Sequence, residues 1–323
     1  MKTDLLSLED GAVIPLPDRG EMPESSHVID ADSIRAVNAA LVTGRPLLVR
    51  GEPGTGKSQL ARAAAEALKR AFVSHAVDSR TETRDLLWSI DAVARLAEAQ
   101  VMGAQRKVAA DEAKKRIAVQ NFLSPGPLWW AFDWSTAREQ AKHVGVSEPR
   151  TPPGWEVDHG VVVLVDEIDK ADPAVPNGLL DALGHRRFDV PGHPVVKMDQ
   201  ARRPLVVITT NEERALPDAF LRRCLVLHLS LPTDREQLVK ELILRGRAHF
   251  ETCSRDVLEA AARLLAEDRE QIRQRDLAPP GVAEYIDLLH AVTGLESDAQ
   301  KQIDLLKQLR SFALRKHPPE LLG

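Results

Sequence analysis

One short stretch of this sequence constrains the fold more than any other. Residues 46–58 read PLLVRGEPGTGKS, an apolar run followed by the spacing G-x-x-x-x-G-K-S over residues 51–58. The apolar run is typical of a buried parallel strand, and the spacing is that of a phosphate-binding loop that leads into a helix. A strand, a phosphate-binding loop and a helix in this order predict an α/β fold. The alternative interpretation is a glycine-rich turn that a Lys-Ser pair follows by chance.

The residue types in this loop suit polyphosphate binding. Glycines let backbone N–H groups approach a phosphate closely, and the helix that begins at Lys57 directs the positive end of its dipole toward the same anion. Lys57 would reach the β- and γ-phosphates, and the Ser58 hydroxyl would bind Mg²⁺. We expect the nucleotide to be held by the residues of this segment, which are Gly51, Glu52, Pro53, Gly54, Thr55, Gly56, Lys57, Ser58 and Gln59.

A second apolar run ends in two carboxylates. Residues 161–165 are VVVLV, as in a strand covered by helices on both faces, and Asp166 and Glu167 follow directly. Ligands of open α/β sheets bind at the carboxyl ends of the strands. We expect Asp166 to share Mg²⁺ with Ser58, and Glu167 to orient and polarise the attacking water. A strand that merely ends in a charged turn is the alternative.

Other polar groups follow a third apolar run. Residues 204–210 (PLVVITT) predict a buried strand that ends at Asn211, whose amide would bond the γ-phosphate or the lytic water. An amide that only caps a turn is the alternative.

Arg222 and Arg223 lie where a short helix is expected, over 218–224. They are either a surface pair or the residues that complete the site of a neighbouring subunit, since a guanidinium suits a transferring phosphoryl group.

Periodicity predicts further elements along the chain. They are a helix before residue 46, a strand over 72–77, an amphipathic helix over 83–99, a solvated helix within 103–120 and a hairpin over 188–196. Lys114, Lys115 and Arg116 could form a nucleic-acid patch, but a solvated helical face is the favoured interpretation. Trp129 and Trp130 are adjacent, so we expect one in the core and the other either toward a partner or buried as well.

Three regions differ in texture. Residues 1–27 are rich in proline, glycine and acidic groups and are expected to be an irregular lead-in. Residues 28–231 are expected to form the α/β nucleotide-binding domain, and 232–323 a small helical domain. Thr233 and Glu236 have the spacing of a capping box that would open its first helix.

Composition limits the class of protein. The chain has 323 residues, of which 43% are apolar, enough for a sizeable core. A net charge of −5 gives no sign of a general nucleic-acid-binding surface. Cys224 and Cys253 have no metal-site spacing and are expected to be buried thiols. Without an apolar segment of membrane-spanning length or a signal-peptide core, a cytoplasmic location is expected.

The ordered motifs GEPGTGKS, VVVLVDE, VVITTN and LPDAFLRRC, followed by a helical region, resemble those of AAA+ ATPases, and of the MoxR-like branch in particular. Three other segments look like that branch too: DSRTETRDLLWSIDAVARL, SPGPLWWAF and LAPPGVAEYIDLL. The resemblance implies a five-stranded parallel sheet flanked by helices, with a C-terminal α-helical lid that closes over ATP, and a homo-oligomer in the form of a hexameric ring.

Residue roles follow from the same resemblance. Lys57 and Ser58 match the Walker A motif, Asp166 and Glu167 match Walker B, Asn211 matches sensor 1, and Arg223 looks like the arginine finger with Arg222 as its companion. The lid departs from the pattern. Where many relatives carry an arginine at the start of the third lid helix, residues 279–282 read PPGV, and Arg273 or Arg275 could substitute.

The implied function is Mg²⁺-dependent ATP hydrolysis that drives chaperone-like remodelling of a protein partner, for which a von Willebrand factor A domain protein is a candidate. Adenine specificity follows from the resemblance alone. One rival is a nucleotide-regulated ring scaffold, for example in a conflict or defence system, in which hydrolysis is incidental. The other is an AAA+ motor that acts on nucleic acid.

Overall fold

The computed structural model describes residues 4–20, 22–104, 109–275 and 277–315, and it divides into two compact units. The first unit contains Arg35–Val49 and Ala64–Leu227, with the described residues up to Ser7. The second contains Leu8–Ile34, Arg50–Ala63 and the described residues from His228 onward.

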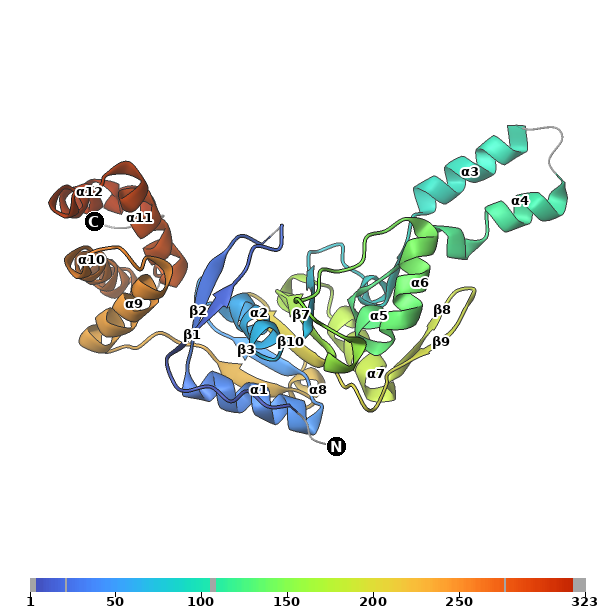
Figure 1. Ribbon diagram of the computed structural model, residues 1–323, viewed down its shortest axis with the longest axis horizontal. Coiled ribbons are helices and arrows are strands. Elements are labelled where there is room, and N and C mark those ends of the chain that lie inside the picture. Colours follow the sequence, from blue (N-terminus) through green and yellow to red (C-terminus); the bar gives the residue numbers. More distant parts are fainter. Residues whose placement is uncertain (1–3, 21, 105–108, 276, 316–323) are drawn as a thin grey trace. The chain divides into compact units, whose positions relative to one another are not determined.

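A five-stranded sheet organises the first unit (Figure 1). Its order is β11 (Leu225–His228), β3 (Leu47–Arg50), β10 (Leu205–Thr210), β7 (Val161–Asp166) and β4 (Ala71–Ala76). Strand β7 pairs in parallel with both neighbours, so that Val163 lies opposite Val206 of β10 and Val73 of β4. The predicted five-stranded parallel sheet flanked by helices is confirmed.

The apolar runs explain why these strands lie inside. All of Val161–Val165 is buried, as expected for a strand that is covered on both faces. One apolar cluster joins β4, β7 and β10 to α5 (Pro127–Phe132), α6 (Trp134–Val144) and α7 (Ala174–His185). Three further helices adjoin the strands along the chain: α1 (Ala31–Thr43), α2 (Lys57–Ala67) and α8 (Asp218–Leu221). Short 3₁₀ turns at Val157–His159 and Ile168–Lys170 lie just before and just after β7.

Both adjacent tryptophans belong to this core. The exposed fractions of Trp129 and Trp130 are 0% and 4%. The Trp129 indole donates to Thr136 Oγ1 at 3.0 Å, and the Trp130 ring packs edge-on against Trp134 with centroids 4.8 Å apart. The alternative in which both are structural therefore holds, because α5 is covered on more than one side.

The segment after β4 differs from expectation. Instead of one helix over 83–99, the chain forms a 3₁₀ turn (Thr83–Leu86) and then strand β5 (Trp88–Ile90), which pairs antiparallel with β6 (Leu123–Pro125). For residues 83–90 the prediction was wrong, because the helical spacing of the apolar residues could not reveal a β partner more than 30 residues away. Residues 92–99 are helical, as predicted. Between these strands lie α3 (Ala92–Ala104), α4 (Ala110–Arg116) and a 3₁₀ turn (Val119–Phe122).

Helices α3 and α4 lie side by side and extend away from the sheet (Figure 1). Arg116 of α4 pairs with Glu98 of α3 at 2.8 Å. Val93 and Leu96 of α3 are 81% and 60% exposed. Part of the expected solvated helix is therefore present, whereas residues 105–108 lie outside the described residues.

A hairpin occupies much of the expected irregular lead-in. Strand β1 (Ala12–Leu16) pairs antiparallel with β2 (Ser25–Ile29). Ile14 and Leu16 are buried while Val13 is half exposed, a period-two pattern that the prolines and glycines around it concealed. This hairpin belongs to the second unit.

Among the described residues from 228 to 315, the chain forms four helices: α9 (Arg235–His249), α10 (Arg255–Arg273), α11 (Val282–Leu295) and α12 (Ala299–Ala313). Leu242, Leu258, Tyr285 and Leu306 are fully buried in their common core. The first of these helices is capped by Asp234, which accepts from Gln237 N at 2.8 Å, and not by Thr233 as expected.

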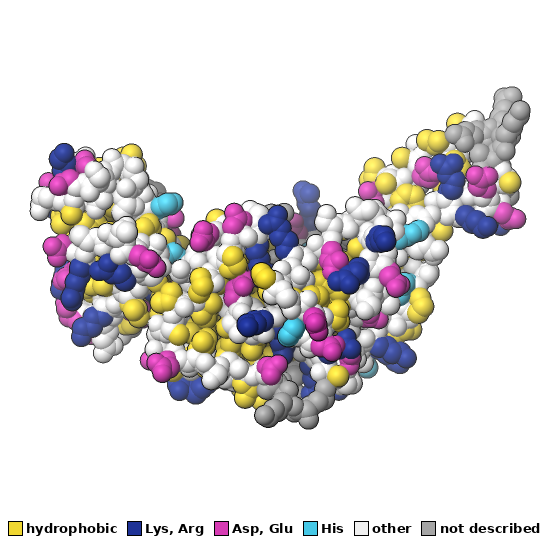
Figure 2. Space-filling view, viewed as in Figure 1, with side chains coloured by type: hydrophobic (Ala, Val, Ile, Leu, Met, Phe, Trp, Pro, Cys, Tyr) yellow, Lys and Arg dark blue, Asp and Glu magenta, His cyan; other side chains and the backbone are white. Residues whose placement is uncertain are grey.

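Other local expectations are confirmed. Strands β8 (Arg187–Val190) and β9 (His193–Lys197) form the predicted hairpin, and Cys224 and Cys253 are buried. None of the helices in the described part of the chain is long and apolar enough to cross a membrane. Figure 2 shows acidic and basic side chains interspersed on the face in view.

Candidate functional site

The carboxylates at the end of β7 are bonded to the strand beside it. Asp166 is the last residue of β7, and its Oδ1 accepts a 2.5 Å hydrogen bond from Thr209 Oγ1 of β10. The same hydroxyl oxygen accepts from the Glu167 backbone N–H at 2.9 Å. Thr209 is fully buried. The parallel pairing of β7 and β10 thus places the Thr209 hydroxyl within hydrogen-bonding distance of both Asp166 and Glu167.

Both side-chain oxygens of Glu167 also have partners. Asn211 Nδ2 donates to Oε1 at 2.9 Å, and Lys170 Nζ lies 2.5 Å from Oε2. The hydrogen bond that Lys170 donates to the Glu167 carboxylate, followed by the charge of that carboxylate, raises the pKa of Lys170. Glu167 has φ = +60°, a left-handed conformation that is uncommon for a residue other than glycine and that concentrates at functional sites. The structure therefore brings together Asp166, Glu167 and Asn211.

The paired arginines lie at the end of α8, and both are exposed. A third arginine holds their backbone. The Arg45 guanidinium donates to the carbonyl oxygens of Arg222, Arg223 and Cys224, with the last two at 3.1 Å. Arg45 thereby satisfies carbonyl groups that the short helix leaves open.

The glycine-rich loop belongs to the second unit and follows β3. Gly51, Gly54 and Gly56 have φ of +152°, +74° and +96°. These conformations disfavour any residue with a Cβ atom. At Gly51 space is also lacking, since an added Cβ would lie 2.2 Å from the Leu229 carbonyl oxygen. The loop therefore has the backbone that a phosphate cradle requires.

Side chains of the loop lie against its own backbone. Lys57 is 6% exposed, and its Nζ donates to the carbonyl oxygens of Gly51 at 2.8 Å and Glu52 at 2.9 Å. The buried Thr55 hydroxyl donates to the Glu52 carbonyl at 2.9 Å. The ammonium group of Lys57 is therefore placed over the curve of the loop, where the motif predicts phosphate binding.

The side chains of Gln59 and Glu52 have partners outside the loop. The Gln59 side chain hydrogen-bonds to His27 of β2. Glu52 pairs with Arg269 and Arg273 of α10. Although burial raises the pKa of the Glu52 carboxyl, hydrogen bonds from these two arginines hold it below its ordinary value. Arg273 therefore lies beside the loop, and Arg275 is exposed after the end of α10.

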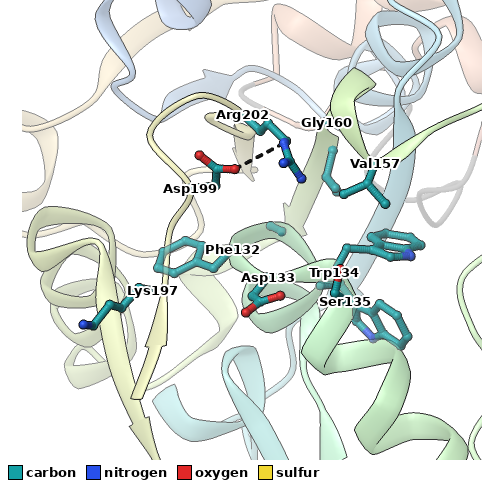
Figure 3. A pocket seen from close by; sticks show the side chains of 12 residues that line it. Phe132, Asp133, Trp134, Ser135, Val157, Gly160, Lys197, Asp199 and Arg202 are labelled. Atoms are coloured by element: carbon teal, nitrogen blue, oxygen red, sulfur yellow. Dashed lines mark ion pairs between the residues drawn. The ribbon is translucent and has the colours of Figure 1, made fainter. Parts of the chain in front are cut away.

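A cavity of about 270 Å³ lies at the other end of β7, beside Gly160 (Figure 3). Phe132 and Trp134 line it, and its Arg202 pairs with Asp199 at 3.2 Å. The amino end of a parallel strand is not where ligands of open α/β sheets bind. This cavity is therefore separate from the carboxylate motif.

Three residues were missed in the sequence. Thr209 hydrogen-bonds to the carboxylate motif (Asp166 and Glu167), and Lys170 pairs with Glu167. Arg45 holds the backbone of residues 222–224, here called the arginine turn. Lys170 lies three residues after Glu167, which would have allowed the pair to be anticipated. Arg45 is separated from its partners by about 180 residues, and no local pattern indicates such a contact.

Comparisons with known proteins cover the same segments. The sequence profile of the AAA domain (dynein-related subfamily) matches residues 46–224. Among solved structures, the chain is similar to the Thermotoga maritima RuvB Holliday junction branch migration motor, with 15% identity and a TM-score of 0.42, over 86% of this chain and 66% of that one. Two Thermotoga maritima RuvB mutants match with identities of 15% and 14%, TM-scores of 0.43 and 0.38, and coverage of 86% and 83% of this chain and 66% and 70% of theirs.

The chain thus spans 66% of the length of the first of these structures. No curated protein shows significant sequence similarity to it. The profile match extends over more than half of the 323 residues and includes the glycine-rich loop, the carboxylate motif and the arginine turn. The chain therefore belongs to the AAA domain family, in its dynein-related subfamily.

Proposed function

We propose that this chain is a Mg²⁺-dependent ATPase whose turnover drives the remodelling of a protein partner, in the manner of MoxR-like proteins. The proposal rests on the hydrogen bonds that join Asp166 and Glu167 to Thr209 and Asn211. These residues lie at the carboxyl ends of two neighbouring parallel strands. A carboxylate pair held in this way, together with a loop whose backbone suits phosphates, has the parts that nucleotide hydrolysis needs.

Each residue has a distinct role in this proposal. Backbone N–H groups of the loop and the Lys57 ammonium bind the β- and γ-phosphates. The Ser58 hydroxyl and the Asp166 carboxylate are oxygen donors of the kind that Mg²⁺ prefers, and Mg²⁺ supplies charge neutralisation at the phosphates. Glu167 orients the attacking water and accepts its proton, and Asn211 fixes the direction of the Glu167 carboxylate.

The proposed active form is a hexameric ring. Arg223 of one subunit stabilises charge on the phosphoryl group held by the next, with Arg222 as its companion. Exposure of both arginines, on a turn whose backbone Arg45 holds, supports this role.

A protein is the proposed partner, and a von Willebrand factor A domain protein is the first candidate. The exposed apolar residues Val93 and Leu96 of α3 support a protein-binding role for the hairpin that α3 forms with α4. Groups of both signs occur there, as in the pair of Glu98 with Arg116, which favours protein over nucleic acid.

The Glu167→Gln variant tests the proposal. It keeps the size of the side chain but removes the base, so we expect ATP to bind and turnover to fall by about 100-fold or more. Glu139→Gln, on the exposed surface of α6, is the matched control and should match the parent protein. Parental turnover in Glu167→Gln would refute the proposed mechanism.

The partner requires a separate measurement. Adding a von Willebrand factor A domain protein should stimulate ATP turnover several-fold if hydrolysis drives remodelling, whereas a scaffold would show no stimulation. A motor acting on nucleic acid would instead bind DNA or RNA with an affinity that falls steeply with added salt.

A further inference from the structure

A carboxylate lies inside the loop that is proposed to bind a polyanion. Glu52 is the second residue of that loop, and an unpaired negative charge there would repel phosphates. Its carboxylate is instead paired twice, because Oε1 accepts from Arg273 at 3.0 Å and Oε2 accepts from Arg269. The two arginines are four residues apart and therefore share one face of α10.

Arg269 depends on this pairing. Its side chain is 2% exposed, which makes it one of the most deeply buried charges among the described residues. It also donates to the Pro280 carbonyl at 2.7 Å, just before α11 begins. Burying an unpaired charge is costly, so Glu52 is the counter-ion that allows the guanidinium to remain among the C-terminal helices.

The start of α11 contacts the same loop. The Ala283 backbone N–H donates to the Gly54 carbonyl at 3.3 Å. At Gly281 an added Cβ would lie 3.0 Å from the Pro53 carbonyl oxygen, so the two backbones lie close together. Helices α10 and α11 are therefore both joined to the loop, one by ion pairs and one by its backbone.

We propose that Glu52 is a positioning residue, which holds the phosphate-binding loop and helices α10 and α11 in one arrangement through its ion pairs with Arg269 and Arg273. This inference rests on the proposed binding of ATP by the loop. Without the Glu52 charge, Arg269 has no counter-ion among the described residues and the loop loses its support, so ATP binds a less ordered cradle. The water-activating residues Glu167 and Asn211 directly follow β7 and β10, and their action at saturating ATP is unaffected.

Glu52→Gln tests the inference by two measurements. In the nucleotide-free protein, hydrogen exchange of residues 281–285 should become about tenfold faster, because the contact of α11 with the loop opens more often. In steady-state kinetics, KM for ATP should rise about fivefold or more while kcat stays within about twofold. Glu236→Gln is the control, since Glu236 of α9 pairs with Arg263 of α10 at 3.1 Å on an exposed surface away from the loop's ion pairs.

A second variant separates the ion pair from the side chain alone. Glu52→Gln combined with Arg269→Met removes the buried charge together with its counter-ion, so exchange at residues 281–285 should be slower than in Glu52→Gln but still faster than in the parent, because the bond from Arg269 to the Pro280 carbonyl is lost as well. If Glu52→Gln does not fold, Arg273→Gln at the more exposed arginine should show a smaller rise in the same two quantities.

Parental exchange and parental KM in Glu52→Gln, or in Arg273→Gln where that variant replaces it, would overturn the inference. A fall in kcat with unchanged KM would also overturn it, because it would place Glu52 in the chemical step. If the parent protein hydrolyses no ATP, the proposed function fails, but the exchange measurement still decides whether Glu52 joins the loop to α10 and α11.

Discussion

Asn211 Nδ2 donates a 2.9 Å hydrogen bond to Oε1 of Glu167. Lys170 Nζ lies 2.5 Å from the other oxygen of the same carboxylate. The two partners differ in kind, since Asn211 is a neutral donor at the end of β10 and Lys170 is a cation on the turn that follows β7. Their removal should therefore have different effects on the proposed water-activating residue.

Asn211→Ala should lower ATP turnover by about 10- to 100-fold, because a hydrogen bond to a charged group is worth about 1.5–3 kcal/mol and here fixes the direction of the carboxylate. KM for ATP should stay within about twofold of the parent. Asn177→Ala, on the exposed surface of α7, is the control. Steady-state kinetics measures both quantities, and parental kcat in Asn211→Ala would exclude this role.

Lys170→Met should raise basal turnover, by no more than about fivefold, as expected for an exposed ion pair. The carboxylate of Glu167 could then turn toward water without first leaving a cation. Lys197→Met, at an exposed lysine of β9, should leave turnover unchanged. If Lys170→Met instead lowered turnover, the ammonium group would be holding Glu167 in its productive direction.

The strands that carry the site were predictable because their signal is local. Residues 161–165 and 205–208 are continuous apolar runs rich in β-branched residues, which is typical of strands covered on both faces. The glycine-rich loop was predictable for a similar reason, because its glycines respond to a backbone requirement within eight residues.

The rest depended on contacts between distant segments. Residues 83–90 have helical apolar spacing, yet Ile90 pairs with Leu123 and the segment forms a strand. Arg45 likewise acts on Arg222 and Arg223, which are far away in sequence. Tertiary contacts of this kind override local preference, and one sequence does not reveal them.

The contact of Arg45 with residues 222–224 leads to a prediction about active sites that two neighbouring subunits share. If Arg223 acts on the next subunit, mixing Arg223→Ala with Lys57→Ala subunits should restore turnover that each lacks alone, since some sites then combine an intact lysine with an intact arginine. Arg45→Ala should behave like Arg223→Ala, because the turn that directs the arginines loses its support. It should be rescued by Lys57→Ala subunits and not by Arg223→Ala subunits.

Arg80→Ala, at an exposed arginine of the same unit, is the control and should be active without mixing. Size-exclusion chromatography with light scattering must show that every variant assembles as the parent does. Recovery of turnover in the mixture of Arg45→Ala with Arg223→Ala would contradict the prediction, and no recovery in any mixture would contradict shared sites altogether.

Gly51→Ala should abolish ATP binding or reduce its affinity at least tenfold. The added Cβ would lie 2.2 Å from the Leu229 carbonyl oxygen, a backbone atom that cannot move aside cheaply, and φ is +152°. Gly103→Ala is the matched control, because no atom lies within 4 Å of its added Cβ and helix α3 should gain about 0.5–1 kcal/mol. Titration with a fluorescent ATP analogue compares the two, and parental affinity in Gly51→Ala would show that the loop relaxes.

His27 makes the second unit sensitive to pH. It is 5% exposed, and burial, followed by the charge of Arg245, lowers its pKa from 6.5 to about 4. Gln59 and Asp30 favour the protonated form but do not outweigh these effects, and His249 nearby opposes it. Between pH 6.5 and about 4 the unfolded chain binds the proton more readily than the folded chain. Stability should therefore fall as pH falls through that range, by no more than about 1.4 kcal/mol per pH unit.

His27→Gln should reduce the dependence of stability on pH between pH 6.5 and 4. Above pH 6.5 the histidine is neutral in the folded and the unfolded chain, so there the substitution should not change how stability depends on pH. Part of the slope should remain, because burial also lowers the pKa of His249. His185→Gln, at a histidine that is 67% exposed, should leave the slope unchanged. All five tryptophans lie between residues 88 and 155, in the other unit, so hydrogen exchange of β2 and α9 is the suitable measurement. An unchanged slope in His27→Gln would mean that the histidine takes up its proton without disturbing the loop it supports.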